Sequence, residues 1–299
     1  GSACGKNLSA ETWGYLGDQK KTNYALRPDM TKEEFIDEVT SGLTPPPQYF
    51  AKNAALNKNG YQNFDQILEK GSVPLNAEKF EAIAEETGAL VLDTRSEQDY
   101  VKSHIPNSIF IGIDGSFAPW VGALIVDLKQ PILLVTPEGR ADGVVTRLSR
   151  VGYDNTLGYL EGGIKAWLNA EKEVERVNGM EPKAFENAVK AGIEGSVLDV
   201  RKPSEYLSQH MENAVNFPLD YINKNMTKLS KDQTYYLYCR GGYRSVITAS
   251  ILKSRGFHKL IDIRKGWNAL SETEIPKSDY QCPTTIPQEI IDNAVAQVI

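Results

Sequence analysis

Cysteine and histidine are scarce in this sequence, and their spacing excludes most sites that are built from them. The 299 residues contain three cysteines and three histidines. Cys4, Cys239 and Cys282 lie too far apart for a disulfide framework or for a C-x-x-C metal site. The histidines show none of the short spacings that form a metal site. We therefore expect no metal and no other cofactor in this chain.

The sequence also lacks long apolar runs and an excess of basic residues. No apolar run approaches the length of about 20 residues that crosses a bilayer, and residues 1–16 lack the features of a signal peptide. The net charge is -6, and Lys and Arg are scattered rather than clustered into a stripe. We therefore expect a cytoplasmic protein with no membrane segment and no nucleic-acid partner.

What the chain does contain is one pattern of features, present twice. Each copy has an apolar run ending in Asp-x-Arg, then a Tyr, a His, a second apolar run, a helical stretch ending at Gly, and a late Trp. In the first copy these features lie at 89–95, Tyr100, 104–108, 132–135, 151–153 and 159–167, and in the second at 196–201, Tyr206, 210–214, 235–238, 255–257 and 261–267. A repeat of this kind indicates two homologous domains.

Within each copy, short β-branched or aromatic runs alternate with helical stretches such as 80–86, 185–190 and 244–255. This alternation predicts an α/β fold, with two open and mainly parallel sheets flanked by helices. We place the domains at 76–178 and 179–281, followed by a C-terminal tail over 282–299. Residues 1–75 show no strand pattern.

The first 75 residues predict short helices joined by loops. Thr31 and Glu34 have the capping-box spacing that begins a helix, and Gly42 ends it. The prolines of residues 44–47 then favour an extended turn. Such a segment has little core of its own, so we expect it to pack on another part of the protein.

The strongest chemical signal is Cys239, which follows an apolar strand and opens a glycine-rich loop that leads directly into a helix. Such a loop turns backbone N–H groups inward, and the helix adds the positive end of its dipole. With Arg240 and Arg244 beside it, the sulfur is favoured as a reactive thiolate. The alternative, a small buried hydrophobic residue at a strand end, leaves the Arg-Gly-Gly-x-Arg context unexplained.

The motif Cys-x-x-x-x-Arg with a glycine-rich centre resembles the active-site loop of rhodaneses, and the Asp-x-Arg, His-x-x-x-Ala and Gly-Trp segments also match that family. The resemblance implies that Cys239 takes a sulfane sulfur from thiosulfate or a thiol persulfide, holds it as a persulfide, and passes it to a thiophilic acceptor. It implies that the sulfur lies in a cradle formed by the loop. Arg244 could also pair internally, and Ser245 would begin the helix. The implied substrate-binding residues are Arg240, Gly241, Gly242, Tyr243, Arg244 and Ser245.

Two alternatives remain open at this stage. Related phosphatases and arsenate reductases have one more residue between the cysteine and the arginine, so the loop length here favours sulfur transfer. The other alternative is a non-catalytic module in which both domains dock partners. The expected partners are small sulfur anions and low-molecular-weight thiol persulfides, and a homo-oligomer is left open.

The first copy lacks this chemistry. Its corresponding segment contains no cysteine, and Pro137 removes a donor while Glu138 adds a negative charge. Arg140 keeps its distance from the end of the following helix, so we interpret it as a structural arginine common to both copies. The first copy resembles an inactive rhodanese-like domain that acts as a scaffold or docking surface.

Four further polar residues recur in both copies, and we interpret all of them as structural. Asp93 and Asp199 directly follow a strand and precede an arginine by two residues, which favours buried carboxylates that pair with it. His104 and His210 are interpreted as residues whose hydrogen bonds fix a loop.

Residues 1–8, 20–26 and 44–47 resemble the last part of the metallo-β-lactamase-fold domain in persulfide dioxygenases that are fused to rhodaneses. The resemblance implies that residues 1–75 are the end of a dioxygenase whose Fe(II)-binding body is missing from this chain. It also implies that the dioxygenase and the transferase act on linked substrates, namely thiol persulfide, thiosulfate and sulfite. Cys4 lies in this motif and is interpreted as structural, and Cys282 as incidental.

Overall fold

The computed structural model describes residues 13–40 and 49–298, which belong to two compact units divided between residues 46 and 47. The first unit contains α1 (Leu16–Thr22), the 3-10 turn η1 (Tyr24–Leu26) and α2 (Lys32–Thr40). The predicted capping box is confirmed, because the Thr31 hydroxyl accepts from the Glu34 N–H at 3.2 Å and the Glu34 carboxylate accepts from the Thr31 N–H at 2.8 Å. Cys4 and the proline-rich turn at 44–47 lie outside the described residues.

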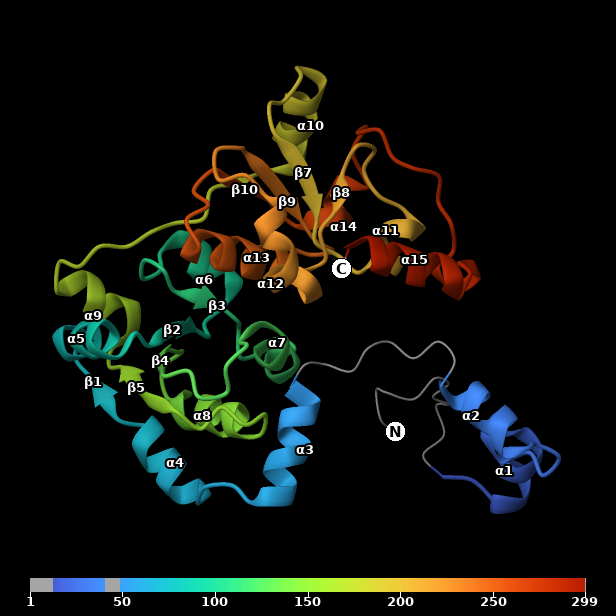
Figure 1. Ribbon diagram of the computed structural model, residues 1–299. Helices are drawn as coiled ribbons and strands as arrows, with labels where there is room; N and C mark the ends of the chain where they lie inside the picture. The colour runs from blue at the N-terminus through green and yellow to red at the C-terminus, as the bar shows by residue number, and fades with distance from the viewer. Residues whose placement is uncertain (1–12, 41–48, 299) are drawn as a thin grey trace. The chain divides into compact units, whose positions relative to one another are not determined.

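The second unit contains two five-stranded sheets with the same strand order, and every pair of neighbouring strands is parallel (Figure 1). The first sheet has the order β1-β5-β4-β2-β3, and the second has β6-β10-β9-β7-β8. The strands of the first are β1 (Pro74–Leu75), β2 (Leu90–Asp93), β3 (Ile109–Phe110), β4 (Ile132–Val135) and β5 (Thr156–Leu160). Those of the second are β6 (Gly179–Met180), β7 (Ser196–Asp199), β8 (Val215–Asn216), β9 (Tyr235–Tyr238) and β10 (Leu260–Ile263).

Helices lie on both faces of each sheet. Around the first sheet they are α5 (Ala77–Thr87), α6 (Glu97–Lys102), α7 (Phe117–Leu124), α8 (Ala141–Ser149) and α9 (Gly163–Asn169). Around the second they are α10 (Pro182–Lys190), α11 (Pro203–Ser208), α12 (Ile222–Asn225), α13 (Tyr243–Ser254) and α14 (Gly266–Leu270), with the 3-10 turns η2 (Leu219–Tyr221) and η3 (Met226–Lys228). The central strands β4 and β9 are buried at every position, as expected for parallel strands covered on both faces. The expected fold class is confirmed.

The segment before the first sheet does not form one body. Although we placed residues 1–75 together, α3 (Tyr49–Asn59) and α4 (Phe64–Gly71) belong to the second unit and pack on the first copy. A β-carbon at Gly122 of α7 would lie 2.2 Å from the Tyr49 ring, and Ile67 of α4 is buried in the core. The break in packing therefore falls some 30 residues earlier than the change in sequence pattern.

Helix α13 lies between the second sheet and the first copy (Figure 1). Every residue from 245 to 252 is buried, because one side of the helix covers β9 and β10 while the other contacts β3 and α6. The Ser250 hydroxyl accepts from the Phe110 N–H at 2.9 Å, a buried hydrogen bond between the two copies. One apolar core therefore runs through both copies.

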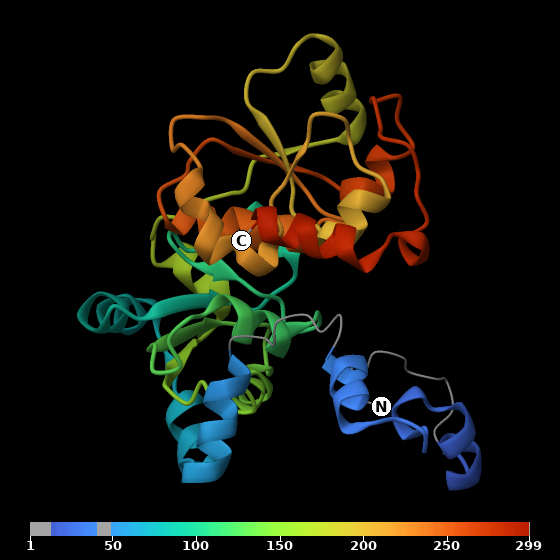
Figure 2. The same ribbon diagram turned by 45° about the vertical axis from the view of Figure 1, so that its right-hand side comes forward.

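The C-terminal segment, placed as a tail over 282–299, contains the turn η4 (Pro283–Thr285) and the helix α15 (Gln288–Val298). α15 lies beside α11 in the second copy, as Figure 2 shows. Ile286, which lies between η4 and α15, is buried. This segment therefore covers the helix that begins just after the second Asp-x-Arg pair.

Candidate active site

The loop that begins at Cys239 curls around the cysteine sulfur. Cys239 directly follows β9 and is 1% exposed. The Gly242 N–H donates to Sγ at 3.1 Å. Gly242 has a φ of 109°, which residues with a β-carbon rarely adopt, so glycine is what allows this N–H to point inward. The predicted arrangement of strand, glycine-rich loop and helix is present, but the helix α13 begins at Tyr243, two residues before Ser245, where we expected it to begin.

A second contact holds the back of the loop. The Cys239 carbonyl accepts from the Trp267 N–H at 2.7 Å, and the Arg240 carbonyl accepts from the Asn268 N–H at 3.0 Å. A β-carbon at Gly266 would lie only 2.2 Å from the Cys239 carbonyl oxygen. The start of α14 therefore approaches the loop as closely as a backbone without a side chain allows.

Arg244 is tied down by a carboxylate that sequence reasoning did not find. Its guanidinium donates two hydrogen bonds to the Glu205 carboxylate, at 2.6 and 2.9 Å. Burial works against the ionised carboxyl, but the hydrogen bonds from Arg244 outweigh it and lower the pKa of Glu205. Of the two roles expected for Arg244, the internal pairing is the one that these contacts show. Glu205 is recognisable in the sequence as the third residue of a helix that begins with proline.

Two other loop residues point away from the sulfur. The Ser245 hydroxyl is buried and donates to the Gly242 carbonyl at 2.9 Å. The Tyr243 hydroxyl donates to the Gly112 carbonyl of the first copy at 3.0 Å, and its ring packs edge-on against Phe110. Burial, the main cause, raises the pKa of Tyr243. Both side chains therefore fix the loop, and Tyr243 fixes it to the other domain.

Arg240 and Gly241 are exposed. Arg240 makes no ion pair with any carboxylate in the described part of the chain. An unpaired cation next to the cysteine attracts small anions to the loop.

The corresponding loop of the first copy is built differently. Thr136 follows β4 as Cys239 follows β9, but the stretch from Thr136 to Arg140 is one residue shorter than that from Cys239 to Arg244. Arg140 pairs with Asp114 at 2.9 Å, and both side chains are well exposed. The interpretation of Arg140 as a structural arginine common to both copies is therefore wrong.

The structural interpretation of the two Asp-x-Arg pairs is confirmed. The buried carboxylates of Asp93 and Asp199 accept from the Arg95 and Arg201 guanidinium groups, each with a shortest distance of 2.6 Å. Burial raises the pKa of Asp93 in spite of this partner. Arg201 also lies over the Trp267 ring, 4.7 Å from its centroid, and so supports the residue that holds the cysteine carbonyl.

Each of the two histidines contacts a backbone carbonyl of the helix just before it, α6 or α11, in keeping with the structural role expected for them. His104 Nδ1 lies 2.9 Å from the Tyr100 carbonyl, and His210 Nδ1 lies 2.7 Å from the Tyr206 carbonyl. Burial lowers the pKa of His104 to about 4. Each histidine ring also stacks on that tyrosine's ring.

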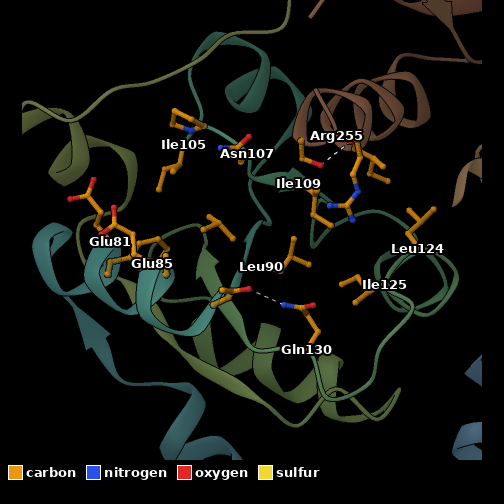
Figure 3. Close-up of a pocket in the computed structure, with 18 of the residues that line it drawn as sticks. Glu81, Glu85, Leu90, Ile105, Asn107, Ile109, Leu124, Ile125, Gln130 and Arg255 are labelled. Carbon is orange, nitrogen blue, oxygen red and sulfur yellow. Dashed lines mark hydrogen bonds between the residues drawn. The ribbon is translucent and has the colours of Figure 1, made fainter. Parts of the chain in front are cut away.

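One large cavity, of about 760 Å³, lies away from the loop (Figure 3). Its floor is apolar around Leu90, Ile105 and Ile109, with Glu81 and Glu85 on one side and Arg255 on the other. None of the predicted site residues lines it. Within the described ranges 13–40 and 49–298, no three His, Cys, Asp or Glu side chains gather where they could hold a metal, and no helix is long and apolar enough to span a membrane.

Comparison with known proteins gives matches to both copies. A family model described as Rhodanese-like domain matches residues 76–170 and 181–273, more than half of the chain. The protein YrkF of Bacillus subtilis (strain 168) is 31% identical over 93 residues, and the match covers 30% of this chain and 50% of YrkF. A protein named Sulfurtransferase from Allochromatium vinosum is 28% identical over 80 residues, which are 27% of this chain and 75% of that protein. The solved structure of thiosulfate sulfurtransferase from Pseudomonas aeruginosa has 19% identity and a TM-score of 0.32, covering 76% of this chain and 47% of that one.

Proposed function

We propose, because this chain belongs to the family of rhodanese-like domains, that its second copy is a sulfurtransferase and that Cys239 carries the sulfur. The observation that carries the proposal is the loop itself, in which the Gly242 N–H donates to the Cys239 sulfur at 3.1 Å. A backbone donor aimed at a sulfur, at the start of a helix of 12 residues, stabilises negative charge there. The sulfurtransferase name of the Allochromatium vinosum relative points the same way.

The reaction proceeds in two displacements. The Cys239 thiolate attacks the outer sulfur of thiosulfate, the S–S bond of thiosulfate breaks, and sulfite leaves with the electron pair. The product is a Cys239 persulfide anion. An acceptor thiolate or cyanide then attacks the outer sulfur, and the Cys239 thiolate leaves. Each step forms one bond to sulfur and breaks one, so no outside oxidant or reductant is required.

The loop residues divide the work between them. The Gly242 N–H faces the anionic sulfur, and the exposed Arg240 attracts the donor anion. Arg244 shapes the cradle through its ion pair with Glu205, and Ser245 and Tyr243 hold the loop from behind. The first copy has no cysteine in its loop and serves as the body on which the active loop is fixed.

We further propose that the chain derives from a fusion of a persulfide dioxygenase with these domains, on the resemblance of residues 1–8, 20–26 and 44–47. The residues described here do not fit the iron that such a dioxygenase binds, because no suitable cluster of ligands is present among them. We assign iron to no residue of this chain, and sulfur transfer is written without it. The cytoplasmic location, the small sulfur anion and thiol persulfide partners, and any homo-oligomer remain predictions.

The test is the intact mass of the protein after incubation with thiosulfate, for the wild type and for Cys239→Ser. We expect the wild type to gain about 32 Da, one sulfur atom, cyanide to release it as thiocyanate, and the variant to gain nothing. If neither thiosulfate nor a thiol persulfide adds a sulfur, the transferase proposal fails. Turnover of an aryl phosphate or of arsenate would then identify a phosphatase or an arsenate reductase. If neither substrate is turned over, the docking module is the remaining alternative.

A further inference from the structure

The cavity shown in Figure 3 is lined by both copies. Its volume of about 760 Å³ lies within the range of about 300–1,000 Å³ typical of small-molecule sites. Most of the lining comes from the first copy, and the second contributes Asn223 and the end of α13, where Ile251 and Arg255 lie. None of the residues from Cys239 to Ser245 lines it. A ligand in this cavity is therefore separate from the active loop.

The floor of the cavity is apolar where the second copy covers the edge of the first sheet. Ile109 of β3 pairs with the residue before Asp93, and Val215 of β8 pairs with the residue before Asp199, so the two positions correspond. Ile109 is 6% exposed because α13 lies against β3, whereas Val215 is 54% exposed. This apolar floor is therefore a product of the tandem arrangement, and it favours a ligand with an apolar body.

Two carboxylates lie one turn apart on the side of α5 that faces the cavity. Glu81 and Glu85 are four residues apart in this helix, and both line the cavity. Lys172 forms an ion pair with Glu81, but no cation of residues 13–40 or 49–298 pairs with Glu85. Like charges at this spacing destabilise a helix. A cation bound between the two carboxylates would remove that repulsion.

The corresponding helix of the second copy provides such a cation itself. Phe80 and Phe185 are buried at the fourth position of α5 and α10, and a glutamate follows each of them. In α10 this glutamate is Glu186, which pairs with Lys190 at 2.7 Å, four residues later. The residue of α5 that corresponds to Lys190 is Glu85. The same fold therefore forms with a lysine at this position, and the first copy has a carboxylate in its place.

A cation lies on the other side of the cavity. Among the described residues that line it, Arg255 is the one basic side chain. It is exposed and forms no ion pair with any carboxylate of the described chain. Figure 3 shows it across the apolar floor from Glu81 and Glu85. A guanidinium in this position is suited to bind a carboxylate.

We propose that this cavity binds a small molecule with an apolar body, a positively charged amine at one end and a carboxylate at the other, which is the chemistry of a short apolar peptide with free ends. Glu85 binds the amine together with Glu81, and Arg255 binds the carboxylate. The apolar body covers the floor around Ile109 and Ile251. Binding makes and breaks no covalent bond, and it does not depend on sulfur transfer.

The first test measures binding of the dipeptide leucyl-phenylalanine to the full chain by calorimetry. Acetylation of its amine or amidation of its carboxylate is expected to weaken binding about tenfold, the loss of one charge-assisted hydrogen bond. Glycyl-glycine has both charges but no apolar side chain, and we expect no measurable binding. The proposal is overturned if the wild type does not bind leucyl-phenylalanine at millimolar concentrations, or if it binds the free and the blocked dipeptides equally.

The second test changes the protein. Glu85→Lys gives α5 the residue that α10 has, and it is expected to weaken leucyl-phenylalanine binding at least about tenfold without weakening that of the acetylated dipeptide. Arg255→Gln should weaken the free dipeptide and leave the amidated one unchanged. The matched control is Glu86→Gln, an exposed glutamate of the same helix that does not line the cavity. Equal affinity of the wild type and Glu85→Lys for the free dipeptide would contradict the assignment.

A third variant separates this proposal from the transferase. Cys239→Ser should bind leucyl-phenylalanine as the wild type does, because Cys239 does not line the cavity. A wild type that binds the dipeptide but never loads sulfur would refute the transferase and leave the cavity site in place. A wild type that loads sulfur but does not bind the dipeptide would refute the cavity site alone.

Discussion

The helices α8 and α13 occupy the same place in their two domains and differ in how much of their surface is covered. α8 buries four residues, Ala141, Val144, Val145 and Leu148, and its other positions are exposed or half-buried. α13 is buried at every position from 245 to 252, because the first copy covers the side that the second sheet does not. The same fold thus covers α13 more completely than α8, and the difference comes from the contact of α13 with the other copy.

The loops that precede these helices differ in the same way. The loop at Thr136 is held by one exposed ion pair, between Arg140 and Asp114. The loop at Cys239 is held by Glu205, by the N–H groups at the start of α14, and by Tyr243 in the first copy. An anion cradle therefore needs supports around the loop as well as a cysteine in it, and the following predictions test this.

The largest expected effect comes from giving the first copy a cysteine. Thr136→Cys in a Cys239→Ser background supplies a thiol at the matching position, beside Pro137, which has no N–H to offer. We expect sulfur loading to stay at least about 10³-fold slower than in the wild type, well within the roughly 10⁶-fold loss that follows removal of a catalytic nucleophile. The measurement is intact mass against time with thiosulfate. Loading at a rate close to that of the wild type would show that the supports are dispensable.

A smaller effect is expected from a methyl group placed at the same position in each copy. Gly266 and Gly163 have φ values of 55° and 57°, but a β-carbon meets the Cys239 carbonyl at 2.2 Å in the second copy and nothing within 4 Å in the first. Gly266→Ala is expected to cost about 3 kcal/mol of unfolding free energy and most of the transferase activity, and Gly163→Ala about 1 kcal/mol. Urea denaturation and thiosulfate turnover measure both. Equal costs would contradict the close contact.

The stability of the first copy should depend on pH through His104. Because burial lowers the pKa of His104 to about 4, below the ordinary 6.5, its contribution to stability is complete above pH 6.5 and is lost as the pH falls towards 4. The free energy of unfolding of the wild type should therefore fall by about 2 kcal/mol more than that of His104→Gln between pH 7.5 and 4.5. His210→Gln is the matched control at a half-buried position. Parallel curves for the wild type and His104→Gln would refute this assignment.

The smallest effect tests the link between the copies. Tyr243→Phe keeps the ring against Phe110 and removes the hydrogen bond to the Gly112 carbonyl. We expect a loss of about 1 kcal/mol in stability and a few-fold fall in sulfur loading. Tyr206→Phe, which removes a similar bond to the Ala214 carbonyl within the second copy, is the control. A larger loss of loading in the control would mean that the first copy does not support the loop.

Features repeated within the sequence were predictable. The two copies revealed the sheets, the Asp-x-Arg pairs and the helix that ends at Gly256, because each depends on local pattern and buried apolar runs. The contacts between copies were not predictable in this way. Tyr243 was assigned to the cradle by its place in the motif, yet its side chain contacts Gly112, 131 residues earlier. Nothing in the local pattern of one copy encodes that pairing.

The same limit explains Arg140 and Lys265. Arg140 has the correct spacing from its helix end, but the loop ahead of it is one residue shorter, so its guanidinium points to Asp114. Lys265 looks like an ordinary surface lysine until its φ of 61° and its neighbour Gly242 are known. The spacing of residues along the chain was enough to predict the helices and strands. The directions of these two side chains depend on the geometry of the loops, which the spacing does not give.

The hydrogen bond between Phe110 and Ser250 joins residues 140 positions apart inside one continuous core. During synthesis the first copy leaves the ribosome well before α13 exists, and domains generally fold in that order. The second copy then folds against a surface that is already formed, and Tyr243 contacts that surface only when the second copy folds. We therefore expect the ability to carry sulfur to appear only after the whole tandem is complete, so that a nascent or truncated chain does not expose a reactive cysteine.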